Sequence, residues 1–156
     1  MPNVITINTA ELAVGHNDDR LKTGSVGSCV VIALYDPVAK VGGLAHAMLA
    51  RRRGGSDTDS DAQAKYVPEA IEHLIAALIR IGGKKNRFVA KLVGGASMFQ
   101  IFDHGKDSIG SQNVQAARDC LADFGIPVES EDTGGTIGRL VEFDLVTGRV
   151  EVNTKM

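Results

Sequence analysis

The sequence predicts an α/β fold of the α+β type: a single domain, residues 1–156, with a mixed β-sheet whose neighbouring strands are mostly antiparallel, and two main helices. Short apolar or alternating segments bounded by turn residues occur at both ends of the chain, and they predict strands. Two segments have apolar residues at helical spacing. Because several adjacent strands are joined by short turns, a doubly wound parallel sheet is not expected.

The N-terminal segment predicts one strand followed by a polar region. Residues 3–8 alternate apolar and polar side chains, which is typical of a strand. A polar stretch, 15–22, comes next. The N-terminus does not have the basic segment, apolar stretch and small-residue cleavage site of a secretory signal.

A buried hairpin is expected next. The segment 29–35 is apolar and rich in β-branched residues, which indicates a central strand covered on both faces. Asp36 and Pro37 stop this strand, and 41–49 is its expected partner, since 36–40 has about the length of a hairpin loop.

The middle of the chain predicts a long loop and then a helix. Residues 51–65 have no periodicity and mix three arginines with glycine, serine and aspartate, so we expect an exposed loop. Pro68 suits a first helical turn, apolar residues recur at helical spacing up to Ile81, and Gly82-Gly83 ends the run.

The C-terminal half predicts a strand, a second helix and a closing hairpin. Residues 88–93 form the strand, and the helix begins near Ser111 and stops at Gly125. After a short extended segment, 126–131, residues 139–144 and 149–153 alternate across Thr147-Gly148.

Composition indicates a cytoplasmic protein. Seventeen basic against nineteen acidic residues give a net charge of −2, which offers no general attraction for nucleic acid or an anionic membrane. The longest apolar run, 29–35, is far short of the roughly 20 residues that a membrane helix needs. Only Cys29 and Cys120 are present, so a reduced compartment fits better than a disulfide framework.

Cys29 is the most informative position for chemistry. It follows Gly27-Ser28 at the expected start of a buried strand, where glycines allow close substrate approach and free backbone N–H groups could face an oxyanion. A thiol needs a basic neighbour to react at neutral pH. His46 lies on the expected partner strand, and Thr23 could fix its imidazole tautomer.

Structural explanations compete with these assignments. A free cysteine in an apolar strand is usually a small core residue, and one Cys with one His is a weak pattern by itself. Cys120 is expected to pack on the second helix, and His16, His73 and His104 to lie in loops or on a helix flank. No cluster has metal-ligand spacing, and the glycine-containing segment 24–28 lacks the lysine of a P-loop and leads into a strand.

Beyond these residues, the sequence resembles the CheD family along nearly its whole length. The resemblance rests on motifs in a conserved order and spacing, with Val26 where the family pattern often has Leu: Gly27-Ser28-Cys29-Val30, Tyr35-Asp36-Pro37, Gly43-Leu44-Ala45-His46-Ala47-Met48-Leu49, Lys65-Tyr66, Lys91-Leu92-Val93-Gly94-Gly95-Ala96-Ser97-Met98-Phe99, Ile109-Gly110, Asn113-Val114, Thr133-Gly134-Gly135 and Gly138-Arg139.

The resemblance implies a chemoreceptor glutamine deamidase. It places the catalytic Cys, His and Thr of the family on Cys29, His46 and Thr23, and it implies acyl transfer through a thioester with no cofactor and no metal. The expected partners are the cytoplasmic helices of chemoreceptors and, as in some family members, a CheC-type phosphatase. The competing class is a non-catalytic adaptor that binds either partner; a redox-sensing thiol is disfavoured because no second Cys lies near Cys29 in sequence.

Overall fold

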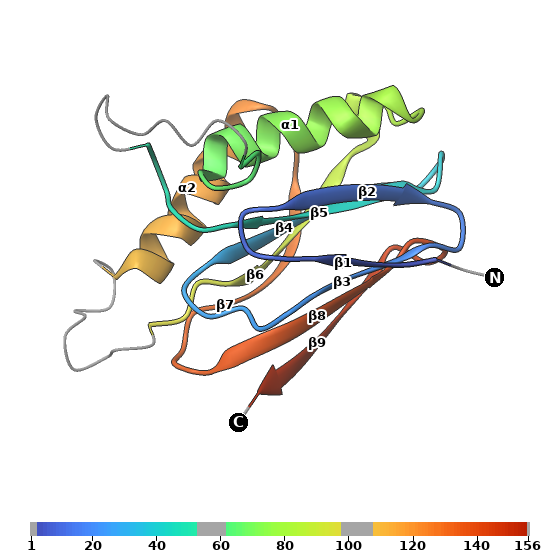
Figure 1. Ribbon diagram of the computed structural model, residues 1–156. Helices are drawn as coiled ribbons and strands as arrows, with labels where there is room; N and C mark the ends of the chain where they lie inside the picture. The colour runs from blue at the N-terminus through green and yellow to red at the C-terminus, as the bar shows by residue number, and fades with distance from the viewer. Residues whose placement is uncertain (1–2, 53–61, 98–107, 156) are drawn as a thin grey trace.

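The chain folds into two stacked β-sheets with two helices on one side (Figure 1). The computed structural model describes residues 3–52, 62–97 and 108–155. The helices α1 (Val67–Arg80) and α2 (Ile109–Asp123) cover the outer face of a five-stranded sheet, and a four-stranded sheet lies against its other face. The expected α+β class with two main helices is confirmed.

The five-stranded sheet contains the predicted hairpin at its centre. Its order is β2 (Leu12–His16), β5 (Val41–Ala47), β4 (Val30–Asp36), β6 (Val89–Gly94) and β7 (Val128–Thr133). Strands β4 and β5 pair antiparallel, and every residue of both is buried because helices cover one face and the second sheet the other. The β6–β7 pair is parallel, so this sheet is mixed.

The four-stranded sheet, which sequence periodicity did not separate from the first, has the order β1 (Val4–Ile7), β3 (Arg20–Thr23), β8 (Gly138–Asp144) and β9 (Arg149–Lys155). Strands β1 and β3 are parallel, and β8 and β9 form the predicted closing hairpin. This sheet is therefore mixed as well.

The polar stretch 15–22 is not simply a connection, because it holds the end of β2 and the start of β3. Strand β3 alternates exposed and buried residues, and its exposed positions are Arg20 and Lys22. These charged side chains hide the strand pattern in the sequence, since only Leu21 and Thr23 face the interior.

Helix α2 begins slightly earlier than expected, at Ile109. Its N-cap is Ser108, whose hydroxyl accepts from the Ser111 backbone N–H at 3.1 Å. Helix α1 has Pro68 in its first turn, as predicted. Within the described part of the chain, no helix is long and apolar enough to cross a membrane.

Apolar side chains form one cluster in each of the two spaces between layers. The cluster between the helices and the five-stranded sheet includes Ile32, Leu74 and Leu121. The cluster between the two sheets, called here the inter-sheet core, includes Ile7, Leu21, Val31 and Leu44. Of the predicted loop 51–65, residues 53–61 lie outside the described residues.

Asp36, the last residue of β4, joins β4 to the turn that follows it and to the segment after α1. Its carboxylate is fully buried, accepts hydrogen bonds from the backbone N–H groups of Val38, Ala39 and Lys84, and pairs with the Arg87 guanidinium, whose Nη2 lies 2.8 Å from Oδ2. Burial alone would raise the pKa of Asp36, but Arg87 and the backbone donors outweigh it and lower that pKa to about 2.

Candidate active site

Cys29 lies in the turn that leads into β4. The residue is half-buried, and its side chain packs against the inter-sheet core together with Val31, two positions further along. The thiol is therefore on the face of the five-stranded sheet that looks toward the second sheet, and it is still partly reachable from solvent.

His46 lies on β5, directly opposite Val31 of β4. Directly paired residues share a face of the sheet, so the imidazole points into the same inter-sheet space as Cys29, on a diagonal across the strand pair. Its backbone is fixed by bonds to the Glu11 carbonyl at 2.9 Å and from the Ala10 N–H at 2.8 Å. The side chain is almost completely buried.

Thr23 comes from the other sheet, at the end of β3. It is buried, lies on the same face of β3 as Leu21, and is the cross-strand partner of Ile7. The backbone of Ile7 is in turn close enough to the imidazole of His46 to influence its protonation. The structure thus brings Cys29, His46 and Thr23 to one space between the two sheets.

Three polar atoms in this space are buried without a hydrogen-bond partner among the described residues. They are Oγ1 of Thr23 and both ring nitrogens, Nδ1 and Nε2, of His46. The Ile7 backbone is near the ring, but it does not form a well-aligned hydrogen bond with either nitrogen. Buried polar atoms are normally paired, so an imidazole with both nitrogens free is available for proton transfer.

Burial shifts the pKa values of both candidate reactive groups. Desolvation raises the pKa of the Cys29 thiol, with a smaller opposing contribution from its own backbone N–H. Desolvation lowers the pKa of His46, and the Ile7 backbone opposes this weakly. Both shifts favour the neutral forms, which are the protonated thiol and the neutral imidazole.

The turn before Cys29 is held by hydrogen bonds from several elements. The backbones of Val26 and Arg139 pair in both directions, at 2.8 and 3.0 Å. The Gly27 carbonyl accepts from Ala96 N–H at 3.0 Å, and the Cys29 carbonyl accepts from Gly95 N–H at 2.7 Å. These bonds tie the turn to β8 and to the segment after β6.

Asn113 of α2 completes this set, and residue-by-residue reasoning from the sequence missed its role. Its side chain is fully buried, and Nδ2 donates to the Ser28 carbonyl at 2.8 Å and to the Met48 carbonyl at 2.9 Å. In sequence, Asn113 was visible only as part of a family motif, because α2 and the turn before Cys29 are far apart along the chain.

Glycines let α2 approach the turn closely enough for these bonds. A Cβ on Gly110 would lie 2.5 Å from the Gly95 and Ala96 carbonyl oxygens, and one on Gly95 would lie 2.3 Å from Val114 Cγ2. Gly95 also has φ of +66°, a conformation that favours glycine. This contact explains Gly95 and Gly110, whereas a Cβ on Gly94 would collide with the Cys29 carbonyl and the Val26 side chain.

The other titratable candidates lie away from this space. Cys120 is on α2 as predicted, where desolvation and then the charges of Glu72, Asp123 and Glu69 raise its pKa to about 11. His16 is exposed next to Asn17, and His73 of α1 contacts the Gln63 carbonyl at 3.0 Å. His104 lies outside the described residues. Among the described residues, no group of three His, Cys, Asp or Glu could hold a metal ion.

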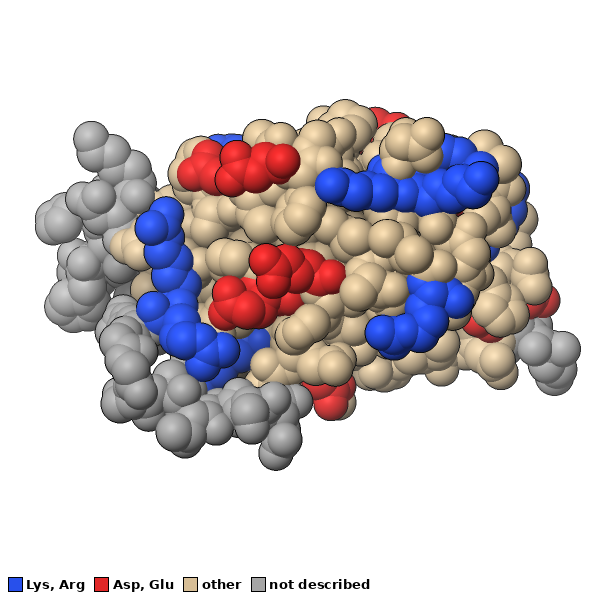
Figure 2. All heavy atoms as spheres, turned by 90° about the horizontal axis from the view of Figure 1, so that it is seen from above, with Lys and Arg blue, Asp and Glu red and all other residues tan. Residues whose placement is uncertain are grey.

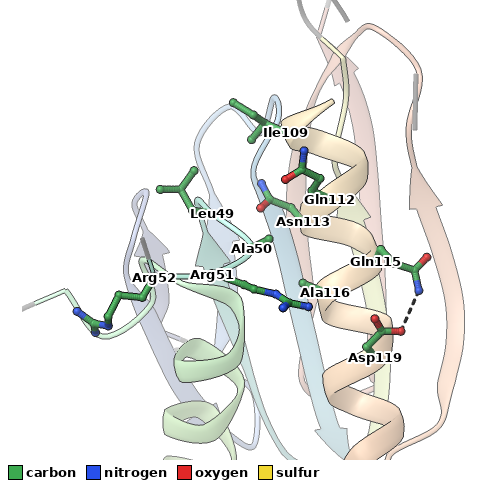
Figure 3. A pocket seen from close by; sticks show the side chains of 10 residues that line it. All are labelled: Leu49, Ala50, Arg51, Arg52, Ile109, Gln112, Asn113, Gln115, Ala116 and Asp119. Atoms are coloured by element: carbon green, nitrogen blue, oxygen red, sulfur yellow. Dashed lines mark hydrogen bonds between the residues drawn. The ribbon is translucent and has the colours of Figure 1, made fainter. Parts of the chain in front are cut away.

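A groove of about 360 Å³ lies between α2 and the segment that follows β5 (Figure 3). Asn113 is part of its wall, but Cys29, His46 and Thr23 are not. Arg51 extends from the segment after β5 toward α2. On α2, the Asp119 carboxylate accepts a hydrogen bond from the Gln115 side-chain amide at 2.9 Å. Figure 2 shows basic and acidic side chains together on the helical face, so neither sign of charge dominates it.

Comparisons with known proteins agree on one family. A family model described as "CheD chemotactic sensory transduction" matches residues 48–154. A "Probable chemoreceptor glutamine deamidase CheD" from Methanococcus vannielii is 39% identical over 149 residues, covering 96% of this chain and 94% of that protein. The "Chemoreceptor glutamine deamidase CheD" of Thermotoga maritima is 42% identical over 146 residues, covering 94% and 88%.

Among solved structures, the Bacillus licheniformis hypothetical protein YfiH is similar with a TM-score of 0.48 and 14% identity. That match covers 78% of this chain but about half, 49%, of the YfiH chain. The family assignment depends instead on the sequence matches, which extend over most of this chain and of the relatives. This chain belongs to the CheD family.

Proposed function

We propose that this protein converts specific glutamine side chains of chemoreceptors to glutamate, with Cys29 as nucleophile and His46 as general base. The names of its relatives support the substrate class. The single observation that supports the chemistry is that Cys29 and His46 share one face of the sheet, with neither imidazole nitrogen hydrogen-bonded to any described residue.

Acyl transfer would proceed in two halves. In the first, His46 takes the thiol proton as Sγ attacks the carboxamide carbon, and backbone N–H groups near Cys29 stabilise the oxyanion. His46 then gives that proton to the leaving nitrogen, the C–N bond breaks, and ammonia departs from a thioester.

Hydrolysis of the thioester completes the cycle. A water molecule attacks the thioester carbon while His46 accepts its proton, and the C–S bond breaks to release glutamate. The proton on His46 returns to Sγ. The sum is glutamine plus water giving glutamate plus ammonia, with no redox change and no cofactor.

Thr23 would orient the imidazole. Its hydroxyl is buried without a hydrogen-bond partner in the described part of the chain. Its cross-strand partner on β1, Ile7, has its backbone next to the His46 ring. A hydroxyl or carbonyl that accepts a hydrogen bond from one ring N–H would fix the tautomer in which the other nitrogen can accept a proton.

The product changes the receptor electrostatically. A neutral carboxamide becomes an anion, which alters repulsion between neighbouring receptor helices and creates a carboxylate that can be methylated. Chemoreceptor cytoplasmic helices as substrate would place the protein in the cytoplasm, and a CheC-type phosphatase would be a second protein partner.

The deciding experiment incubates purified protein with a chemoreceptor cytoplasmic fragment and follows glutamine-to-glutamate conversion by peptide mass spectrometry. Wild-type protein and the Cys120→Ser control should convert defined glutamines, and Cys29→Ala should convert none. Conversion by a folded Cys29→Ala protein would refute the cysteine mechanism. If the wild type binds the fragment but leaves every glutamine intact, the protein is an adaptor instead.

A further inference from the structure

In the turn before Cys29, four successive carbonyl groups accept hydrogen bonds, whereas three successive N–H groups donate none to the described residues. The carbonyls of Val26, Gly27, Ser28 and Cys29 each accept a hydrogen bond. In the described part of the chain, the N–H groups of Gly27, Ser28 and Cys29 donate none. Each bonded carbonyl fixes the orientation of its own peptide, so the N–H of the next residue points the opposite way, and unbonded backbone N–H groups of this kind can bind an anion.

The Ser28 carbonyl differs from the other three, because its donor is a side chain. Asn113 Nδ2 donates two hydrogen bonds, one to the Ser28 carbonyl and one to the carbonyl of Met48, which lies two residues after His46. A single amide group therefore joins the nucleophile turn to the end of the strand that carries the candidate base. Oδ1 of Asn113 is buried and accepts no hydrogen bond from the described residues, so the carbonyl half adds nothing to this link.

The direction of the Ser28–Cys29 peptide follows from this bond. In a trans peptide the C=O and the next N–H point in opposite directions, and the described residues contain no cis peptide bond. The Ser28 carbonyl points toward α2, on the helical side of the sheet. The Cys29 N–H must then point to the inter-sheet side, where the thiol packs. The contribution of this N–H to the pKa of the Cys29 thiol agrees with that direction.

We propose that Asn113 is a positioning residue, which holds the Ser28–Cys29 peptide so that the Cys29 N–H donates to the oxyanion formed on the substrate carboxamide. The inference rests on the proposed cysteine mechanism and adds the identity of one oxyanion donor and the group that aims it. The N–H sits next to the attacking sulfur, so it can reach the oxygen of a carbon bonded to Sγ without a further conformational change.

A structural role for Asn113 makes different predictions from a positioning role. If Asn113 only fastens α2 to the sheet, its loss should lower thermal stability and affect every property of Cys29 together. If it aims an oxyanion donor, its loss should act on the acyl-transfer transition state and spare reactions of the same thiol that develop no oxyanion. Alkylation by iodoacetamide, a displacement at a saturated carbon, is such a reaction.

The experiment compares Asn113→Ala and Asn113→Asp with wild type and with Asn153→Ala, which removes an exposed amide on β9. Ionised aspartate keeps the size of asparagine but has no proton for either carbonyl. For both Asn113 variants, kcat on a receptor fragment should fall roughly 10²–10³-fold, the usual effect of one lost oxyanion donor. KM and the rate of Cys29 alkylation should stay close to wild type, and Asn153→Ala should match wild type throughout.

Wild-type kcat in a folded Asn113→Ala protein would overturn the inference, as would a parallel loss of kcat and alkylation rate. If Cys29→Ala is inactive in either case, the proposed function stands while the role of Asn113 falls. Should both Asn113 variants fail to fold, the wild type supplies the test. A receptor peptide with an aldehyde in place of the carboxamide should add to Cys29 and move the Cys29 amide proton downfield in the NMR spectrum, and an unmoved resonance would contradict the assignment.

Discussion

Val31 of β4 is paired directly with His46 of β5, and this pairing sets the position of Cys29 relative to the imidazole. Cys29 lies two residues before Val31, so it shares the face of His46 but sits diagonally from it. A shift of one residue in this register would turn every side chain of one strand to the opposite face. The hairpin register is thus a requirement of the proposed chemistry.

The two cysteines should differ in reactivity. Cys29 is partly accessible and shares a face of the sheet with the proposed base, whereas burial and nearby carboxylates raise the pKa of Cys120 to about 11. A limiting dose of iodoacetamide should label Cys29 first and abolish deamidation, as peptide mapping would show. Faster labelling of Cys120, or full activity after Cys29 is alkylated, would contradict the assignment. Cys120→Ser should remain active.

Removing the proposed base should slow the reaction without unfolding the protein. His46→Ala should lose roughly 10²–10⁴ in kcat/KM, the usual range for a missing general base. Thr23→Ala should lose less, because Thr23 orients the ring and transfers no proton itself. Circular dichroism of each variant controls for folding. Unchanged kcat/KM in His46→Ala would rule out the mechanism even if Cys29 proved essential.

The activity should have an acid limb set by His46. Only the neutral imidazole accepts the thiol proton, so kcat/KM should fall as pH drops through the pKa of His46. Desolvation lowers that pKa, so the midpoint should lie below the ordinary value of 6.5. Because the pKa of Cys29 is raised, the rate should not fall again until the pH is well above neutral. A midpoint above 6.5 in the pH–rate profile would argue against a desolvated base.

Asp36→Asn should destabilise the fold without touching the chemistry. The substitution leaves Arg87 without its carboxylate partner and should lower the free energy of unfolding by about 3 kcal/mol. This is the low end of the range for buried pairs, because the Arg87 side chain is 27% exposed. The lowered pKa of Asp36 contributes stability above its unfolded value of about 3.9, and this is lost as pH falls toward 2. Urea unfolding at several pH values measures both effects. Exposed Asp18→Asn is the matched control.

Gly110→Ala should reverse the usual effect of alanine in a helix. Alanine normally stabilises a helix by about 0.5–1 kcal/mol relative to glycine. Here its Cβ would lie 2.5 Å from backbone atoms of Gly95 and Ala96, so overpacking should cost about 1–3 kcal/mol. Gly24→Ala has no atom within 4 Å of the new methyl group and should be neutral. Equal unfolding midpoints for the two variants would show that α2 does not pack this closely.

The sequence by itself determined the elements whose patterns are local. Apolar, β-branched residues predicted the central hairpin, helical spacing predicted α1 and α2, and Thr147-Gly148 predicted the last hairpin. The hairpin already put His46 on the strand next to Cys29. Strand β3 was missed because its exposed side is charged, so its alternation is hidden by Arg20 and Lys22.

Only the tertiary structure decided which distant segments meet. Sheet packing divides the strands into two sheets and turns Thr23 toward the space that holds Cys29 and His46. This packing leaves no periodic pattern in the sequence. The contact of Asn113 with Ser28 joins residues 85 positions apart, through a helix that can approach only where Gly95 and Gly110 have no side chain. Such contacts arise from close packing between elements, whereas sequence periodicity records only which face of each element is buried.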